Sequence, residues 1–478
     1  MRFRLAALGL SAGAILGVGC FSGSSAQQDG GEDRIDALIP DAAAPSSCDP
    51  LEAPGDGVYV SASHGDDDAG DGSPLRPYLT LGAAIEAAAV LSQATIYVEE
   101  GTYPESITIR PSTTGVRLRG GWVSAGTAWS RTCPPGVVAR TVIAPTSDPV
   151  AVHVEGAVTA SGLELLTIAT KSHGASLPDT SGETVIGVLV DGEGAAFALT
   201  DVDVLMGDGG DGGQASMGDA GATAPAALSC FLGAACSDGT MGGVGDPGSV
   251  AAAGQFGPDG YVPGDAGDGM PGGSGENGTP SPQGPQQSSS CKEDCSCSGS
   301  CNSPTTTRRG GDGRCGCGGG GGGGGFAGRG GGASIAVMVV GGSTLGVTRG
   351  RLLGGDGGDG SLGGSGGQPA EGAAGAPGST NYCHSGCATG GAACEVNCYS
   401  HDDRPLGGGM AGGPGGPGGL GGTGGAGAGG HSYVMVERAG GHVVLSGAVV
   451  VAGNPGRGAG QGDAAAPSGE ADTLLTLP

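Results

Sequence analysis

The sequence predicts an all-β solenoid, and three observations carry that prediction. A unit of about 23 or 24 residues occurs four times, beginning at Ala151, Gly187, Ala336 and Tyr433. Apolar residues alternate within each copy, as at residues 188–190, which is typical of strands with one buried face. A glycine-bearing turn separates the strands of each copy. Because so small a unit cannot bury its own apolar face, we expect the copies to stack.

Composition limits the size of the folded body. Glycine supplies 111 of 478 residues and aromatic residues only 3%, which is too few large side chains for several conventional cores. Most of the glycine lies in two blocks without the strict period of collagen, a composition typical of low-complexity coil. We therefore expect one folded body with two long, irregular insertions.

The charge balance disfavours several classes of partner. The formal net charge is −27, from 47 acidic and 20 basic residues. Nucleic acid is disfavoured because its binding needs basic patches. A polyanionic polysaccharide would need a local basic patch or a bridging cation. The simplest interpretation of the charge is solubility at a cell surface.

The first 19 residues have the pattern of a secretory signal peptide. Arg2 and Arg4 precede an apolar run of 14 residues, Leu5 to Val18, which is shorter than the roughly 20 residues that span a bilayer. The run leads into Cys20 and resembles a bacterial lipoprotein signal, which implies a lipid on that cysteine and attachment to a membrane. Gly17 stands where this signal usually has leucine, so an ordinary cleaved signal peptide is the alternative.

A flexible tether and then a capped body are expected to follow. Residues 20–50 are small, acidic and proline-bearing, a composition that cannot bury enough surface to fold. From Leu81 to Leu91 the spacing of apolar residues predicts one short helix, with Leu81, Ala84, Ile85 and Ala88 on its buried face. We expect this helix to cover the open first turn of the solenoid, because uncovered strand edges are a liability.

The same region carries a resemblance to a known family. The string YVSASHGDDDAGDGSPLRPYLTLGAAIEAA, from Tyr59, and the later IYVEEGTYPESITI resemble the opening of pectin-lyase-like β-helix proteins. The run GVRLRGGWVSAGTAWSRTC, from Gly115, resembles its continuation in surface β-helix proteins of the myxobacterial type. The resemblance covers roughly residues 57–206. It implies a right-handed parallel β-helix with an N-terminal capping helix, and it is specific for fold rather than function.

The repeats and the glycine-rich blocks together give an expected order of segments. This order is a signal peptide at 1–19, a lipid-anchored tether at 20–50, the cap and first β-helix turns at 51–206, a Gly/Cys-rich insertion at 207–332, one turn at 333–353, a second Gly/Cys-rich insertion at 354–430, and the last turn with a tail at 431–478. Both insertions leave after the third strand of a repeat. We therefore expect them to lie side by side at one corner of the solenoid.

Fourteen of the 15 cysteines are left once Cys20 is set aside, an even number that favours disulfides in an exported protein. The candidates are Cys48, Cys133, Cys230, Cys236, Cys291, Cys295, Cys297, Cys301, Cys315, Cys317, Cys383, Cys387, Cys394 and Cys398. Short cross-links would reduce the disorder of glycine-rich chain. Zinc is the alternative, with His384 and His401 near the last four cysteines, although the spacings are not those of zinc ribbons.

Aspartates at two corresponding corners are candidate calcium ligands. The strings GDGGDGG from Gly207 and GGDGGDGS from Gly354 resemble the nonapeptide calcium repeat. Asp208, Asp211, Asp356 and Asp359 would stack and share a cation through hard oxygen ligands. Turn formation by Asp-Gly is the alternative interpretation. A second acidic loop, with aspartates at positions 66, 67, 68 and 71, has the same two interpretations.

No set of residues predicts catalysis. Arg117 and Arg119 alternate with apolar residues and are expected to face outward. With Lys171 or Arg110 they would bind an acidic sugar, and a solvated sheet face is the alternative interpretation. No pair of carboxylates has a recognisable acid–base spacing. We therefore expect a non-enzymatic cell-envelope lipoprotein, a structural or adhesive element of the outer membrane or cell surface. Its expected partners are the membrane, and polysaccharide or another surface protein. A divergent polysaccharide lyase or glycoside hydrolase is the alternative.

Overall fold

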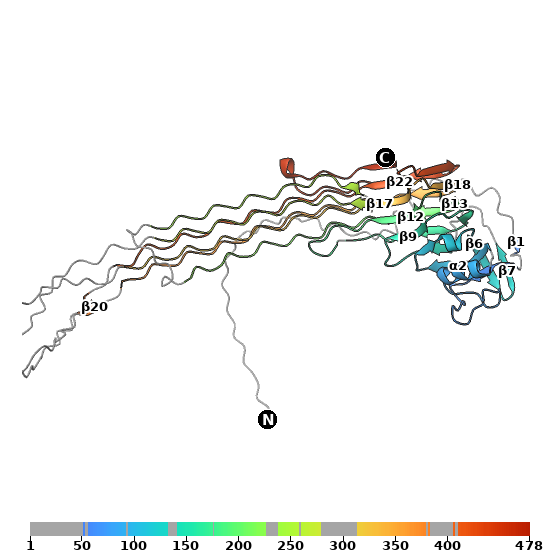
Figure 1. Ribbon diagram of the computed structural model, residues 1–478, viewed down its shortest axis with the longest axis horizontal. Coiled ribbons are helices and arrows are strands. Elements are labelled where there is room, and N and C mark those ends of the chain that lie inside the picture. Colours follow the sequence, from blue (N-terminus) through green and yellow to red (C-terminus); the bar gives the residue numbers. More distant parts are fainter. Residues whose placement is uncertain are drawn as a thin grey trace, which may run out of the picture. The chain divides into compact units, whose positions relative to one another are not determined.

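The computed structural model describes residues 51–52, 56–91, 94–131, 141–174, 176–225, 238–257, 260–278, 313–378, 381–382, 405–406 and 410–478. Within these ranges the chain is mostly β structure, arranged largely as parallel sheets (Figure 1). One α-helix, α2 (Leu81–Val90), and two short 3-10 turns, η1 (Pro111–Thr113) and η2 (Gly462–Ala464), complete the described elements. The expectation of a β-rich fold is confirmed.

Three sheets contain nearly all of the strands. The first comprises β1 (Leu51–Glu52), β2 (Val58–Val60), β3 (Thr95–Glu99), β6 (Arg117–Ala125), β7 (Ala128–Arg131), β10 (Ser161–Glu164), β13 (Ala196–Thr200), β18 (Thr344–Thr348) and β23 (His442–Ser446). The second comprises β4 (Gly101–Tyr103), β8 (Thr141–Ile143), β11 (Thr167–Ala169), β14 (Asp203–Leu205), β19 (Arg351–Leu353) and β24 (Val449–Val451). The third comprises β5 (Ile107–Ile109), β9 (Val150–Glu155), β12 (Val185–Asp191), β17 (Ser334–Val340), β22 (Ser432–Arg438) and β25 (Ala471–Leu477).

The four sequence repeats each contribute one strand to each sheet. Strands β9, β10 and β11 form the first repeat, and each following repeat adds its strands in the same order. Successive repeats pair in parallel, so that Leu163 lies beside Leu199, which lies beside Val347. The four repeats identified in the sequence are therefore neighbours in space, although up to about 130 residues of glycine-rich chain separate two successive repeats.

One apolar core runs through the stack. Val188, Leu199, Val204 and Leu352 are fully buried in it. Each position is covered by the corresponding apolar residue of the next repeat, which gives continuous columns of Val, Leu and Ile. Burial of such columns is the main favourable term for a fold built of small units.

Three strands of the third sheet, β12, β17 and β22, are buried on both faces, which differs from the expected single buried face. A hairpin of β15 (Gln255–Gly257) and β16 (Gly260–Val262) packs over its outer side, where Tyr261 joins a second apolar cluster. Val436 belongs to this outer cluster and pairs with Met338. Aligning the repeats by their Val-x-Val pattern would instead place Val436 beside Val339, one residue out of register. The alternation misleads here because both faces are apolar.

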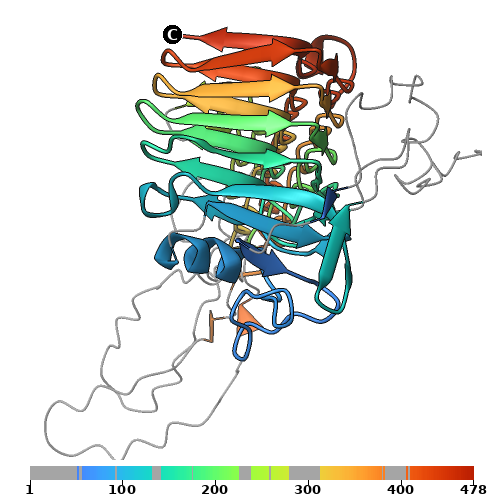
Figure 2. The same cartoon turned by 90° about the vertical axis from the view of Figure 1, so that its right-hand side faces the viewer.

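The N-terminal end of the stack is covered as expected. In Figure 2 helix α2 lies against the first strands, and Leu81, Ala84, Ile85 and Ala88 form its buried face. The Thr80 hydroxyl accepts a hydrogen bond from the Ala83 amide, which caps the first turn. The Glu105 carboxylate also accepts hydrogen bonds from the Leu81 and Gly82 amides at 2.8 and 3.1 Å.

The described parts of the two glycine-rich insertions are regular, which contradicts the expectation of irregular coil. They form six extended segments, 207–225, 238–254, 264–278, 313–332, 354–378 and 410–430, which we call the glycine bundle (Figure 1). Backbone hydrogen bonds join them at every third residue. The amides of Gly239, Gly242, Gly245 and Gly248 donate to the carbonyls of Pro414, Pro417, Leu420 and Thr423 at 2.8–3.0 Å. A three-residue period is that of the polyproline II conformation.

Segments 313–332 and 410–430 occupy the centre of the bundle. The first exchanges hydrogen bonds with 207–225, 264–278, 354–378 and 410–430. The second exchanges them with 238–254, 264–278, 313–332 and 354–378. Glycine is required at these contacts. A Cβ atom at Gly322 would lie 1.8 Å from the Gly367 carbonyl oxygen, and one at Gly324 would lie 1.8 Å from that of Gly269. The glycine content therefore permits close packing of backbones, as in other polyproline II assemblies.

The bundle is joined to the stacked repeats by hydrogen bonds. The Gly182 amide donates to the Gly330 carbonyl, and the Gly210 amide donates to that of Glu183. The buried His431 ring lies at the same junction. Its Nε2 is 3.1 Å from the Gly254 carbonyl oxygen, and its Nδ1 accepts from the Glu470 amide at 2.6 Å.

Candidate functional site

A cluster of serine, histidine and glutamate side chains lies at the N-terminal end of the stack. Glu99 ends β3, Ser61 follows β2, and Ser124 lies in β6. Parallel pairing of β2 with β3 and of β3 with β6 brings the three positions together. His64 reaches them from the turn after β2. A grouping of serine, histidine and glutamate could form a nucleophile–base–acid arrangement, so its geometry decides whether it does.

The Glu99 carboxylate is the centre of this cluster. Its Oε1 accepts from the Ser124 hydroxyl at 2.6 Å, and its Oε2 accepts from the Ser63 hydroxyl at 3.1 Å and from the Ser61 hydroxyl at a shorter distance. His64 Nδ1 lies 3.4 Å from Glu99 Oε2 and 2.8 Å from Ser61 Oγ. The Glu99 side chain is 11% exposed, and that of His64 is 44% exposed.

Burial and hydrogen bonding act in opposite directions on Glu99. Desolvation by itself would raise the pKa of this carboxyl group. The hydroxyls of Ser124, Ser61 and Ser63, together with nearby His64, outweigh it and hold the pKa below its usual value of 4.5. The cluster therefore stabilises an ionised carboxylate inside the fold.

The arrangement is suited to holding a loop in place. In a hydrolase the histidine would remove the proton of the nucleophilic serine. Here Ser124 Oγ lies 2.6 Å from Glu99 and 3.5 Å from His64 Nε2, so its proton is donated to the carboxylate. Ser61 is fully buried. The cluster fastens the loop after β2 to β3 and β6. One signal of this cluster is visible in the sequence, a glutamate at the end of the apolar strand Thr95–Glu99. Sequence reasoning missed its partners.

The aspartates proposed as calcium ligands are brought into two columns. Asp208 Oδ1 accepts from the Asp356 amide, and Asp211 Oδ1 accepts from the Asp359 amide, both at 2.7 Å. The first column extends by one more residue, since Asp356 Oδ1 accepts a hydrogen bond from the Asn454 amide at 2.7 Å. The predicted alignment of these corners is thus found. In each case, one carboxylate oxygen bonds the backbone of the neighbouring repeat.

Asp211 is partly withdrawn from solvent in these columns. Desolvation by burial raises its pKa above the usual value of 3.8. The neighbouring charges of Asp359 and Asp208 raise it further, while the Asp359 amide acts in the opposite direction.

In the described part of the chain, no three His, Cys, Asp or Glu side chains are grouped closely enough to hold a metal ion.

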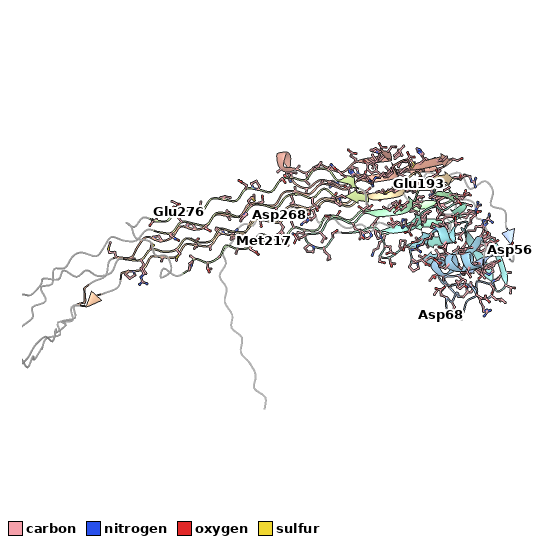
Figure 3. The ribbon with its side chains drawn as sticks, viewed as in Figure 1. Asp56, Asp68, Glu193, Met217, Asp268 and Glu276 are labelled. Carbon is pink, nitrogen blue, oxygen red and sulfur yellow. The ribbon has the colours of Figure 1, made fainter. Side chains whose placement is uncertain are left out.

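An open groove of about 600 Å³ lies beside these columns on the glycine bundle. Its lining side chains include Asp211, Gln214, Met217, Asp359, Leu362 and Ser365. Met217 is labelled on this part of the bundle in Figure 3. The groove combines hydrogen-bonding groups with the apolar side chains of Ala215, Met217 and Leu362, which suits a neutral polar ligand better than an acidic one.

In the second acidic loop, the carboxylates accept hydrogen bonds from the loop itself and from the residues just before α2. Asp66 Oδ1 accepts from the Asp68 and Ala69 amides at 2.8 and 2.9 Å. Asp67 accepts from the Leu79 amide and the Thr80 hydroxyl, both at 2.8 Å, just before α2. These contacts are the turn chemistry weighed as the alternative.

The outward arginines are engaged with neighbouring repeats. Arg119 Nε donates to Glu164 at 2.8 Å, and Arg110 Nε donates to Glu155 at 3.2 Å. Arg117 Nε donates to the Ala160 carbonyl at 3.2 Å. These interactions favour the interpretation of a solvated sheet face over an acidic-sugar site.

Cys317 is bonded in a disulfide. Both Cys317 and Cys315 are buried. The other twelve disulfide candidates, the zinc alternative with His384 and His401, and the lipidation site at Cys20 lie outside the described residues. In the described ranges, no helix has the length and apolar character needed to cross a bilayer.

No protein-family model matches the chain, and neither a curated protein nor a solved structure shows significant similarity to it.

Proposed function

We propose that this chain is a right-handed parallel β-helix lipoprotein that acts as a structural and adhesive element of the cell envelope. The lipid on Cys20 and the tether at residues 20–50 would hold the stacked repeats and the glycine bundle at the outer membrane or cell surface. The disulfides predicted for the insertions belong to the same proposal, because an exported protein meets an oxidising environment.

The observation that carries this proposal is the hydrogen-bonded continuity between repeats and bundle. Residues 313–332 enter β17 directly, and residues 354–378 leave β19 directly. Within the bundle the backbones are joined by hydrogen bonds at every third residue. Such hydrogen bonding supports a stiff extension with a large, regular surface, which is what a structural element needs.

The adhesive part of the proposal rests on the groove beside Asp211 and Asp359. Gln214 and Ser365 offer hydrogen bonds, and Met217 and Leu362 offer apolar surface. Neutral glycans present both hydroxyls and apolar ring faces, so we propose them as the ligand class.

The test is a glycan array with residues 51–478, run with calcium and with chelator, with product analysis of each hit. We expect binding without cleavage, lost in Gln214→Ala and kept in the control Gln368→Ala, which lies outside the groove. Shortened glycans among the products would overturn the structural interpretation in favour of a lyase or hydrolase.

Surface labelling of intact cells that express the full chain, compared with Cys20→Ser, tests the lipid anchor.

A further inference from the structure

The two ends of the stacked repeats differ in how they are covered. At the N-terminal end, α2 packs over the first strands and buries four of its apolar residues. At the other end, β23, β24 and β25 are each the last strand of their sheet. In the described residues, no helix or strand pairs with their outer edges. These edges present unpaired backbone donors and acceptors, which natural proteins normally cover, shorten or charge.

The interior of the stack reaches solvent at this uncovered end. In the first sheet, the column of paired residues Leu163, Leu199, Val347 and Leu445 is 1%, 0%, 0% and 39% exposed. In the third sheet, the column Val152, Val188, Val337, Met435 and Leu474 is 0%, 0%, 0%, 7% and 44% exposed. In the second sheet, Val450 follows the fully buried Leu352 and is half-buried. One interior side chain from each sheet is therefore accessible to solvent at this end.

This end is also nearly free of charge. His442 and Asp472 are the only ionisable residues in β23, β24 and β25, whereas the whole chain has a net charge of −27. Two copies of an acidic chain repel each other over most of their surfaces, but not here. The three edges also lack the prolines, lysines and bulges that prevent edge-to-edge pairing.

From these observations we propose that the end formed by β23, β24 and β25 is a self-association surface, on which the same end of a second copy packs. A second copy supplies three strand edges around an apolar centre, and two-fold symmetry brings these edges antiparallel to those of the first copy. The exposed column ends at Leu445, Val450 and Leu474 become buried, and the edge amides and carbonyls gain partners. This proposal does not depend on the envelope function proposed above.

The experiment measures the mass of residues 51–478 by sedimentation velocity from about 1 to 200 μM. We expect a reversible dimer, since an apolar patch with free strand edges favours association. Leu445→Asp places a charge at the exposed column end and is expected to raise the dimer Kd at least about tenfold. Val444→Asp is the matched control. Val444 is the adjacent residue, is 57% exposed and points to the opposite side of the strand. The dimer Kd of Val444→Asp should therefore stay within about threefold of the wild-type value.

Hydrogen exchange at low and high concentration locates the contact. We expect the amides of β23, β24 and β25 to gain protection at high concentration, with circular dichroism of Leu445→Asp unchanged. A monomer across the whole concentration range would overturn the proposal. Equal weakening by both variants, or protection that appears instead in the glycine bundle, would also overturn it.

Discussion

Glu99 shows how a single buried charge can fasten a loop to the end of the stack. Its carboxylate is ionised because three serine hydroxyls and His64 compensate for its burial. We expect Glu99→Gln to lower the free energy of unfolding at pH 7 by about 1–3 kcal/mol, the usual cost of weakening hydrogen bonds to a charged group. Glu193→Gln, at an exposed turn, is the control and should have little effect.

The pH dependence of this difference follows from the lowered pKa of Glu99. A carboxyl group with a lower pKa in the folded state stabilises the fold above its unfolded value of 4.5 and loses this contribution as the pH falls through the folded value. Chemical denaturation of wild type and Glu99→Gln should therefore converge in acid. A difference that stays constant from pH 7 to pH 3 would contradict the assignment.

We expect the ionised Asp211 carboxylate to destabilise the fold, unlike that of Glu99, because burial and two neighbouring aspartates raise its pKa. Asp211→Asn keeps an oxygen that can accept from the Asp359 amide while removing the repulsion. We expect the variant to be more stable than wild type at pH 7, by up to about 1 kcal/mol. The gain should vanish below pH 3.8, where the wild-type group is protonated in both states. Thermal unfolding with and without calcium checks this, since destabilisation of the variant only in calcium would indicate a cation at the corner.

At the scale of elements, the repeats depend on apolar columns. Leu199→Ala removes a fully buried side chain in the middle of one column and should cost about 2–5 kcal/mol in denaturant unfolding. Leu445→Ala, at the exposed end of the same column, should cost less than about 1 kcal/mol in the monomer. Equal costs would contradict the stacking order.

The glycine bundle depends on the absence of side chains at its contacts. Gly322→Ala would place a Cβ atom against the Gly367 carbonyl, and we expect it to destabilise the bundle by about 1–3 kcal/mol through overpacking. Gly243→Ala is the matched control, because no atom lies within 4 Å of its Cβ position. Limited proteolysis of the bundle under native conditions should be faster in the first variant only. Equal proteolysis of both variants would indicate that the segments are not packed.

At the scale of the whole molecule, the sequence allowed prediction of what depends on short-range periodicity. The four repeats, the buried face of α2 and the alignment of Asp208 with Asp356 follow from patterns within about 25 residues. The register of β22 was missed because both faces of its sheet are apolar. The Glu99 cluster was missed because Ser61, Glu99 and Ser124 come from three separate strands or turns.

The glycine bundle was missed for the same physical reason on a larger scale. Its partners are remote, as in the hydrogen bond from Gly242 to Pro417, and glycine carries no side chain that would indicate a buried face. Composition alone therefore suggests coil. The signal that was available is the spacing of glycine pairs in 410–430, where every third residue is larger: Ala411, Pro414, Pro417, Leu420 and Thr423.

The glycine-rich segments form an ordered bundle with a three-residue hydrogen-bond period. Hydrogen exchange with single-residue resolution tests it directly. In 238–251 we expect protection at every third amide, Gly239, Gly242, Gly245, Gly248 and Ala251. In the central segment 313–332 we expect it at more positions, because the amides of Gly319 and Gly320 both donate to neighbouring segments. Uniform exchange at the rate of unfolded chain in both segments would contradict the account.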